Sequence, residues 1–195
     1  MDTFVDIVKK YSSIDTTYGT DKNTSHSYGP VYETIFREFR TNKNNILEIG
    51  FDSGASLQVY SEYFYNSEIY GIDIIDHCLP YIKQNKHIHL LFGDAKNKNT
   101  VNYYNKQYNI IIEDASHLLE DQITHFKDYN EFVSLGGLYI IEDVHEQNLH
   151  LLKNELEPLS ISKGFTLKII DLRHIKHRFD DILFVFTKIK NLISS

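Results

Sequence analysis

The stretch Ile110-Ile111-Ile112-Glu113-Asp114 decides the fold, because an apolar, β-branched run that stops in carboxylates is typical of a buried parallel strand ending at a sheet edge. The stretch Leu138-Tyr139-Ile140-Ile141-Glu142-Asp143 repeats this pattern. In open α/β sheets, ligands bind at the carboxyl ends of the strands. Two neighbouring strands would therefore bring Asp114, Glu142 and Asp143 to one edge, where their oxygens suit a hard divalent cation.

His117 stands three residues beyond Asp114. An imidazole beside a cation site is a candidate general base, because its ordinary pKa lies near neutrality. We therefore expect the two acidic strand ends and His117 to form one site.

Apolar runs alternate with helical patterns along the rest of the chain, and this alternation predicts a mostly parallel sheet with helices on both faces. The strands other than the two acidic ones are expected at residues 45–50, 68–73, 87–94, 165–170 and 181–187. Helices are expected at residues 55–64 and 118–132, and a later helix is expected to close at Pro158. Gly136-Gly137 is expected to turn the chain into the second acidic strand.

No helix-length segment separates the last two apolar runs, which predicts that they pair as an antiparallel hairpin. The sequence thus predicts an α/β fold, a doubly wound, mostly parallel, seven-stranded Rossmann-like sheet with a C-terminal antiparallel hairpin. The 195 residues suit a single domain. Residues 1–44 precede the first strand and are expected to form an N-terminal helical lid segment over the carboxyl edge of the sheet.

Composition excludes several classes of partner. A formal net charge of -7 lacks the basic excess with which proteins hold phosphate backbones, so nucleic acid is not expected. No apolar run approaches the roughly 20 residues that span a bilayer, and the first residues lack a signal-peptide core. We therefore expect no membrane partner and a cytoplasmic location. Cys78 is the only cysteine, so no intramolecular disulfide is possible.

The loop Gly50-Phe51-Asp52-Ser53-Gly54 follows the first strand, where doubly wound folds hold a nucleotide-like cofactor. A dinucleotide fingerprint would carry a glycine at the middle position, but Asp52 there, with Glu48 upstream, would repel a pyrophosphate. S-adenosylmethionine has no phosphate and carries an ammonium and a sulfonium, so it suits this acidic loop better. Asp73 ends the second strand, where a carboxylate accepts from ribose hydroxyls, and Asp94 ends the third, where it could accept from the adenine amino group.

These motifs resemble a class I S-adenosylmethionine-dependent methyltransferase. The resemblance rests on Leu47-Glu48-Ile49-Gly50, Gly54-Ala55-Ser56-Leu57, Tyr70-Gly71-Ile72-Asp73 and Glu113-Asp114-Ala115-Ser116-His117. It implies that Glu48, Gly50, Gly54, Ser56, Asp73 and Asp94 bind the cofactor.

A narrower resemblance covers residues 18 to 195. The segment Tyr18-Gly19-Thr20-Asp21-Lys22, followed by His26 and Tyr28, joins the two acidic strand ends in a pattern similar to metal-dependent macrolide-sugar O-methyltransferases and to their relatives called cephalosporin hydroxylases. The resemblance implies that Asp114, Glu142 and Asp143 hold magnesium and that His117 is the general base. A coordinated hydroxyl has a lowered pKa, so this set could make an alcohol nucleophilic near pH 7.

The expected activity is therefore S-adenosylmethionine- and Mg-dependent methylation of a hydroxyl on a sugar, which is nucleotide-activated or part of a glycan or glycoside, with polysaccharide biosynthesis as one setting. Two alternatives stay open. One is methylation of a catechol-like or other natural-product hydroxyl, since catechols also offer two adjacent oxygens. The other is a non-catalytic cofactor-binding module. A homo-oligomer is compatible with the sequence.

Several of these residues also fit purely structural roles. Asp114 suits a helix N-cap, and Glu142 with Asp143 suits a solvated strand exit. His145 fits a loop histidine as well as a rival base, and the basic cluster at residues 173–178 fits a solvated loop as well as a phosphate contact. Adjacent strand residues point to opposite faces, so Glu142 and Asp143 reach one ion only if the strand is already turning.

Overall fold

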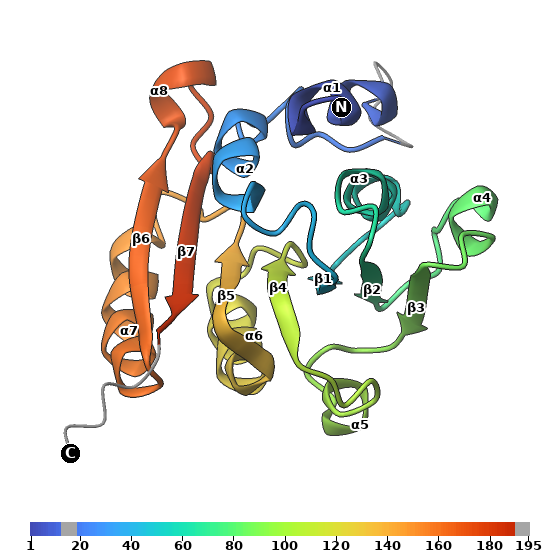
Figure 1. Cartoon of the computed structure of the whole chain (residues 1–195). Helices are drawn as coiled ribbons and strands as arrows, with labels where there is room; N and C mark the ends of the chain where they lie inside the picture. The colour runs from blue at the N-terminus through green and yellow to red at the C-terminus, as the bar shows by residue number, and fades with distance from the viewer. Residues whose placement is uncertain (13–18, 190–195) are drawn as a thin grey trace.

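A single mixed sheet organises the computed structural model, which describes residues 1–12 and 19–189 (Figure 1). The strand order is β3-β2-β1-β4-β5-β7-β6. The strands are β1 (Asn45–Ile49), β2 (Glu68–Asp73), β3 (Ile88–Phe92), β4 (Tyr108–Glu113), β5 (Val133–Ile141), β6 (Phe165–Asp171) and β7 (Ile182–Lys188). The first five are parallel to one another, and β7 runs antiparallel to both β5 and β6. The predicted doubly wound, seven-stranded fold with its closing hairpin is confirmed.

Helices cover both faces of this sheet (Figure 1). They are α1 (Phe4–Tyr11), α2 (Gly29–Phe36), α3 (Ala55–Tyr63), α4 (Pro80–Lys83), α5 (Lys98–Val101), α6 (Leu119–Tyr129) with the 3-10 turn η1 (Asn130–Phe132), α7 (Leu149–Ser162) and α8 (Arg173–Lys176). None of the helices in the described residues is long and apolar enough to cross a bilayer.

Alternation along the strands builds two apolar cores. Ile110 and Ile112 of β4 pack in the core beneath α1, α2 and α3, together with aromatic residues such as Tyr32. Ile111 packs in the opposite core, which Phe126 of α6 helps to fill. The central strands are therefore buried on both sides, which explains their uninterrupted β-branched sequences.

Two local predictions are wrong. Gly136 and Gly137 lie inside β5 rather than before it, where Gly136 has φ +79° and the register against β4 shifts. Helix α7 also continues through Pro158 to Ser162. Pro158 and Asn154 are both exposed, so the carbonyl that loses its helical partner can bond to water. The opposite face keeps α7 on the sheet through buried Leu152 and Leu156.

Gly50 fixes the path of the chain from β1 into the site. Its φ is +82°, and a Cβ atom there would lie 2.3 Å from the carbonyl oxygen of Asp114. Gly50→Ala is therefore expected to lower the free energy of unfolding by about 3 kcal/mol, since it combines left-handed strain with a backbone clash. Chemical denaturation measures this change.

Gly136→Ala is the matched control for that substitution. Gly136 shares the positive φ, at +79°, but nothing lies within 4 Å of its added Cβ among the described residues. It should cost only about 1 kcal/mol. Equal losses in the two variants would mean that the approach of Gly50 to Asp114 does not matter.

Candidate active site

Two adjoining cavities open at the carboxyl edge of the central strands. Their volumes are about 310 Å³ and 280 Å³. Both are lined by Gly50, Asp52, Asp114 and Ala115, so the loop after β1 and the end of β4 separate them. This arrangement gives one cleft with two lobes that meet at Asp114.

The first lobe, of about 310 Å³, is lined by Asp73 and Asp94 together with apolar residues such as Ile72 and Ala95. Asp73 Oδ2 accepts hydrogen bonds from the backbone N–H groups of Phe51 (2.9 Å) and Asp52 (2.8 Å). Asp73 thereby holds the loop after β1 in place. The lobe combines acidic hydrogen-bond acceptors with apolar walls, as an adenosine group requires.

The second lobe, of about 280 Å³, contains the acidic strand ends and His117. Asp114, His117 and Asp143 each place a ligand atom within 4.8 Å of the others. His117 Nε2 lies 3.7 Å from Asp143 Oδ2. His117 and Asp143 have φ values of +57° and +52°, so the chain turns sharply where each side chain enters the lobe. The predicted meeting of two strand ends and a histidine is therefore found.

Glu142 turns away from this group toward the interior. Its Oε2 atom accepts a hydrogen bond from Lys22 Nζ at 2.7 Å, and its Oε1 atom accepts one from the Tyr32 hydroxyl. Burial, followed by the nearby Asp114, raises the pKa of Glu142 above its ordinary value. The turn at Asp143 thus sends these two adjacent carboxylates to different partners at the same edge.

Glu48 also lies beneath the cleft rather than in its walls. Its buried carboxylate accepts from the Ser56 hydroxyl and lies 3.4 Å from Lys22 Nζ. Burial raises its pKa to about 7. Of the residues assigned to the cofactor, Gly50, Ser56, Asp73 and Asp94 line the cleft, whereas Glu48 and Gly54 are not among the lining residues of either lobe in the described part of the chain.

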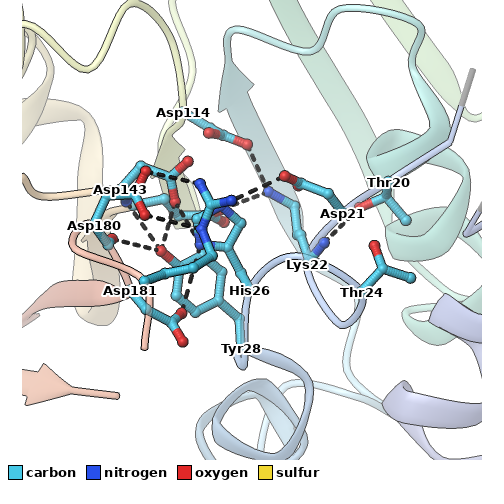
Figure 2. Close-up of polar contacts among 12 residues, drawn as sticks. Thr20, Asp21, Lys22, Thr24, His26, Tyr28, Asp114, Asp143, Asp180 and Asp181 are labelled. Atoms are coloured by element: carbon cyan, nitrogen blue, oxygen red, sulfur yellow. Dashed lines mark hydrogen bonds and ion pairs between the residues drawn. The ribbon is translucent and has the colours of Figure 1, made fainter. Parts of the chain in front are cut away.

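Residues from the N-terminal segment complete the edge; the sequence predicted a lid there but assigned no role to the individual side chains. Figure 2 shows Lys22, His26 and Tyr28 pointing toward Asp114 and Asp143. The Tyr28 hydroxyl donates to Asp143 Oδ1 at 2.5 Å, and His26 Nδ1 lies 3.3 Å from the same atom. Burial, followed by the nearby Asp114, raises the pKa of Asp143 to about 6. The one feature of the sequence that pointed to Lys22, His26 and Tyr28 was their place in the motif that carries the narrower resemblance. Tyr18, which begins that motif, lies outside the described residues.

The two other regions with open roles lie outside the lobes. The His145 ring packs against Phe179 with ring centroids 4.5 Å apart. In the basic cluster, Arg178 forms a two-pronged ion pair with Asp180. Lys176 donates to the backbone carbonyls of residues 23, 24 and 26, so this cluster holds the N-terminal segment in place.

The acidic groups at and beneath the second lobe fit a hard divalent cation. The carboxylates of Glu48, Asp114 and Glu142 converge around one lysine ammonium, and Asp143 lies beside Asp114. Burial raises the pKa of Asp143 to about 6 and that of Glu48 to about 7, which means that their ionised forms are destabilised in the fold. A cation bound by Asp114 and Asp143 would stabilise the ionised form of the buried Asp143, and oxygen ligands are those that magnesium prefers.

The strand order and the two-lobed cleft define the α/β methyltransferase fold. The MycE methyltransferase from the mycinamycin biosynthetic pathway, solved in complex with Mg, SAH and mycinamycin VI, matches this structure with a TM-score of 0.75 at 21% sequence identity. The match covers 100% of this chain and 56% of that chain. The chain belongs to the FtsJ-like methyltransferase family, whose model matches residues 32–190.

Curated relatives agree with the narrower resemblance. Demethylmacrocin O-methyltransferase of Streptomyces fradiae is 32% identical over 129 residues, which is 61% of this chain and 32% of that protein. Mycinamicin VI 2''-O-methyltransferase of Micromonospora griseorubida is 30% identical over 144 residues, which is 68% of this chain and 35% of that protein. This chain therefore matches only about a third of the length of these relatives.

Proposed function

We propose that this protein is an S-adenosylmethionine- and Mg-dependent O-methyltransferase that acts on a sugar hydroxyl. The observation that carries the proposal is the two-lobed cleft, in which an adenosine-like lobe and an acidic, histidine-containing lobe meet at Asp114. Such a cleft can hold a methyl donor and an acceptor side by side, and holding both at near-attack distance supplies much of a rate acceleration. The similarity to sugar O-methyltransferases supports this choice.

The walls of the first lobe are proposed to bind the adenosine part of the cofactor. Asp73 would accept from the ribose hydroxyls and Asp94 from the adenine amino group, while Gly50 lets the backbone approach closely. Asp52 lines both lobes, and its carboxylate suits the ammonium of the methionine part. Glu48 would not contact the cofactor itself but would orient the hydroxyl of Ser56, which lines the second lobe.

The second lobe is proposed to carry the chemistry. A divalent cation there would lower the pKa of a coordinated acceptor hydroxyl, with Asp114 and Asp143 as its ligands and Glu142 behind them. His117 would accept the hydroxyl proton at Nε2 as the O–H bond breaks and the oxygen forms its bond to the methyl carbon, while the S–CH₃ bond of the donor breaks and its electron pair returns to sulfur, leaving S-adenosylhomocysteine. Asp143 Oδ2, at 3.7 Å from that nitrogen, stabilises the protonated imidazole. Residues 19–22 line the same lobe, which supports the lid role of the N-terminal segment.

A sugar is favoured over a catechol by the character of the second lobe. Acids and hydroxyls dominate its walls, including Thr20, Asp21 and Ser53, and among the described residues that line it Phe51 carries the one phenyl ring. Polar groups suit the many hydroxyls of a sugar, whereas a catechol would call for stacked apolar walls. A cytoplasmic location, a homo-oligomer, a lack of nucleic-acid partners and a setting in polysaccharide biosynthesis stay predictions from the sequence.

Calorimetry followed by a transfer assay tests the proposal. We expect S-adenosylmethionine to bind and NAD not to bind, because Asp52 faces the cleft where a pyrophosphate would lie. Methyl transfer is then measured on a panel of sugar nucleotides and glycosides, with catechol as the rival acceptor. Lack of S-adenosylmethionine binding would overturn the whole proposal, and transfer to catechol alone would overturn its sugar part.

A further inference from the structure

One buried ammonium joins the carboxyl ends of the three central strands. Lys22 Nζ lies 2.7 Å from Asp114 Oδ2, 2.7 Å from Glu142 Oε2 and 3.4 Å from Glu48 Oε1. Asp114 follows β4, Glu142 follows β5, and Glu48 lies in β1, which neighbours β4 in the sheet. The side chains of Lys22 and Glu142 are 3% and 2% exposed, so their contact is shielded from bulk water, whereas Asp114 is 22% exposed.

These contacts exclude Lys22 from direct acid–base chemistry. An ammonium has three protons, and three carboxylates surround this one. Two of its protons are hydrogen-bonded to Asp114 and Glu142, and Glu48 lies 3.4 Å away, so the ammonium is held by the acidic strand ends rather than presented to a substrate.

We propose that Lys22 is a positioning residue, whose ammonium fixes the carboxylates of Asp114 and Glu142 in the arrangement that receives the divalent cation. This inference rests on the proposed function and deepens it. Lys22 holds Oδ2 of Asp114 (Figure 2), and among the described residues no hydrogen bond or ion pair involves Oδ1 of this carboxylate, which lines the second lobe. It also clamps Glu142 between itself and Tyr32. Groups that orient metal ligands in this way typically change metal affinity by 10- to 100-fold when they are lost.

A simpler role for Lys22 predicts the opposite result. If Lys22 only balanced the charge of the acids, its removal would make the lobe more negative and tighten cation binding. If it positions the ligands, its removal loosens Asp114 and weakens binding. The direction of the change in cation affinity separates the two roles.

The experiment compares Lys22→Met with Lys176→Met. Lys176 also holds the N-terminal segment, through the carbonyls of residues 23, 24 and 26, but within the described residues it makes no hydrogen bond or ion pair with the acidic strand ends. Calorimetric titration with Mn²⁺ or Mg²⁺ alone is expected to show about 10- to 100-fold weaker binding for Lys22→Met and less than about threefold change for Lys176→Met. Unchanged or tighter binding by Lys22→Met would overturn the positioning role.

Thermal melting in EDTA separates this inference from the proposed function. Removing one partner of a buried charge cluster leaves the others unpaired, so Lys22→Met is expected to melt about 10 °C below wild type without any metal present. If the wild-type protein binds no divalent cation, both the metal dependence of the proposed function and the positioning role of Lys22 are contradicted. Melting of Lys22→Met within about 2 °C of wild type would show that Lys22 does not hold the strand ends together.

Lys22→Arg keeps the inference testable if Lys22→Met does not fold. A guanidinium retains the positive charge but cannot place one nitrogen among three oxygens. The variant should fold, yet bind the cation at least about tenfold more weakly. Wild-type affinity in this variant would show that charge alone suffices.

Discussion

Replacing His117 with Ala is expected to lower the turnover number by about 10²- to 10⁴-fold, because a positioned base contributes that much to proton removal. Among the described residues His117 is the only histidine that lines the second lobe, and its imidazole is 40% exposed, so it can reach an acceptor hydroxyl. Single-turnover methyl transfer at saturating S-adenosylmethionine measures the effect. Calorimetry should show unchanged cofactor binding, since His117 does not line the adenosine-like lobe.

His150→Ala provides the matched control for this variant. His150 is an exposed histidine on α7 and lines neither lobe. Its loss should leave the turnover number within about twofold of wild type, as is usual for an exposed surface position. Full activity in His117→Ala would show that His117 is not the base.

The strands and their acidic ends were predictable because burial on both faces leaves a direct trace in the sequence. The predicted strand at residues 68–73 coincides with β2, and the one at 45–50 contains β1. A carboxylate that follows such a run is costly in a core, so its place at the sheet edge follows from composition. That reasoning brought Asp114, Asp143 and His117 together before any geometry was known.

The different partners of Glu142 and Asp143 could not be predicted in the same way. It depends on the left-handed backbone of Asp143 and on Lys22, Tyr28 and Tyr32, which lie more than 100 residues earlier in the chain. A lysine in a polar segment produces no periodic signal, and its burial arises only when the N-terminal segment packs across three strand ends. The Pro158 error has a similar origin, because packing of Leu152 and Leu156 outweighs a local helix-breaking signal.

Removal of the divalent cation is expected to lower the rate of methyl transfer by about 10³-fold, since a metal that lowers the pKa of a bound hydroxyl supplies several kcal/mol of stabilisation in the transition state. The physical reason lies in the second lobe, where buried Asp143 and the neighbouring Asp114 face His117. The measurement compares transfer after EDTA treatment with transfer after Mg²⁺ is restored. Binding of S-adenosylmethionine should persist in EDTA, because Asp73 and Asp94 lie in the other lobe.

Asp143→Asn should reproduce the effect of EDTA even when Mg²⁺ is in excess, because an amide oxygen carries no charge to hold the cation. Asp171→Asn is its matched control: Asp171 also ends a strand, β6, but it is exposed, pairs with Arg173 and lines neither lobe. If transfer were insensitive to EDTA and to Asp143→Asn, neither a divalent cation nor the charge of Asp143 would take part in the reaction. The loss in His117→Ala would then persist without a metal, so the two predictions test separate parts of the same site.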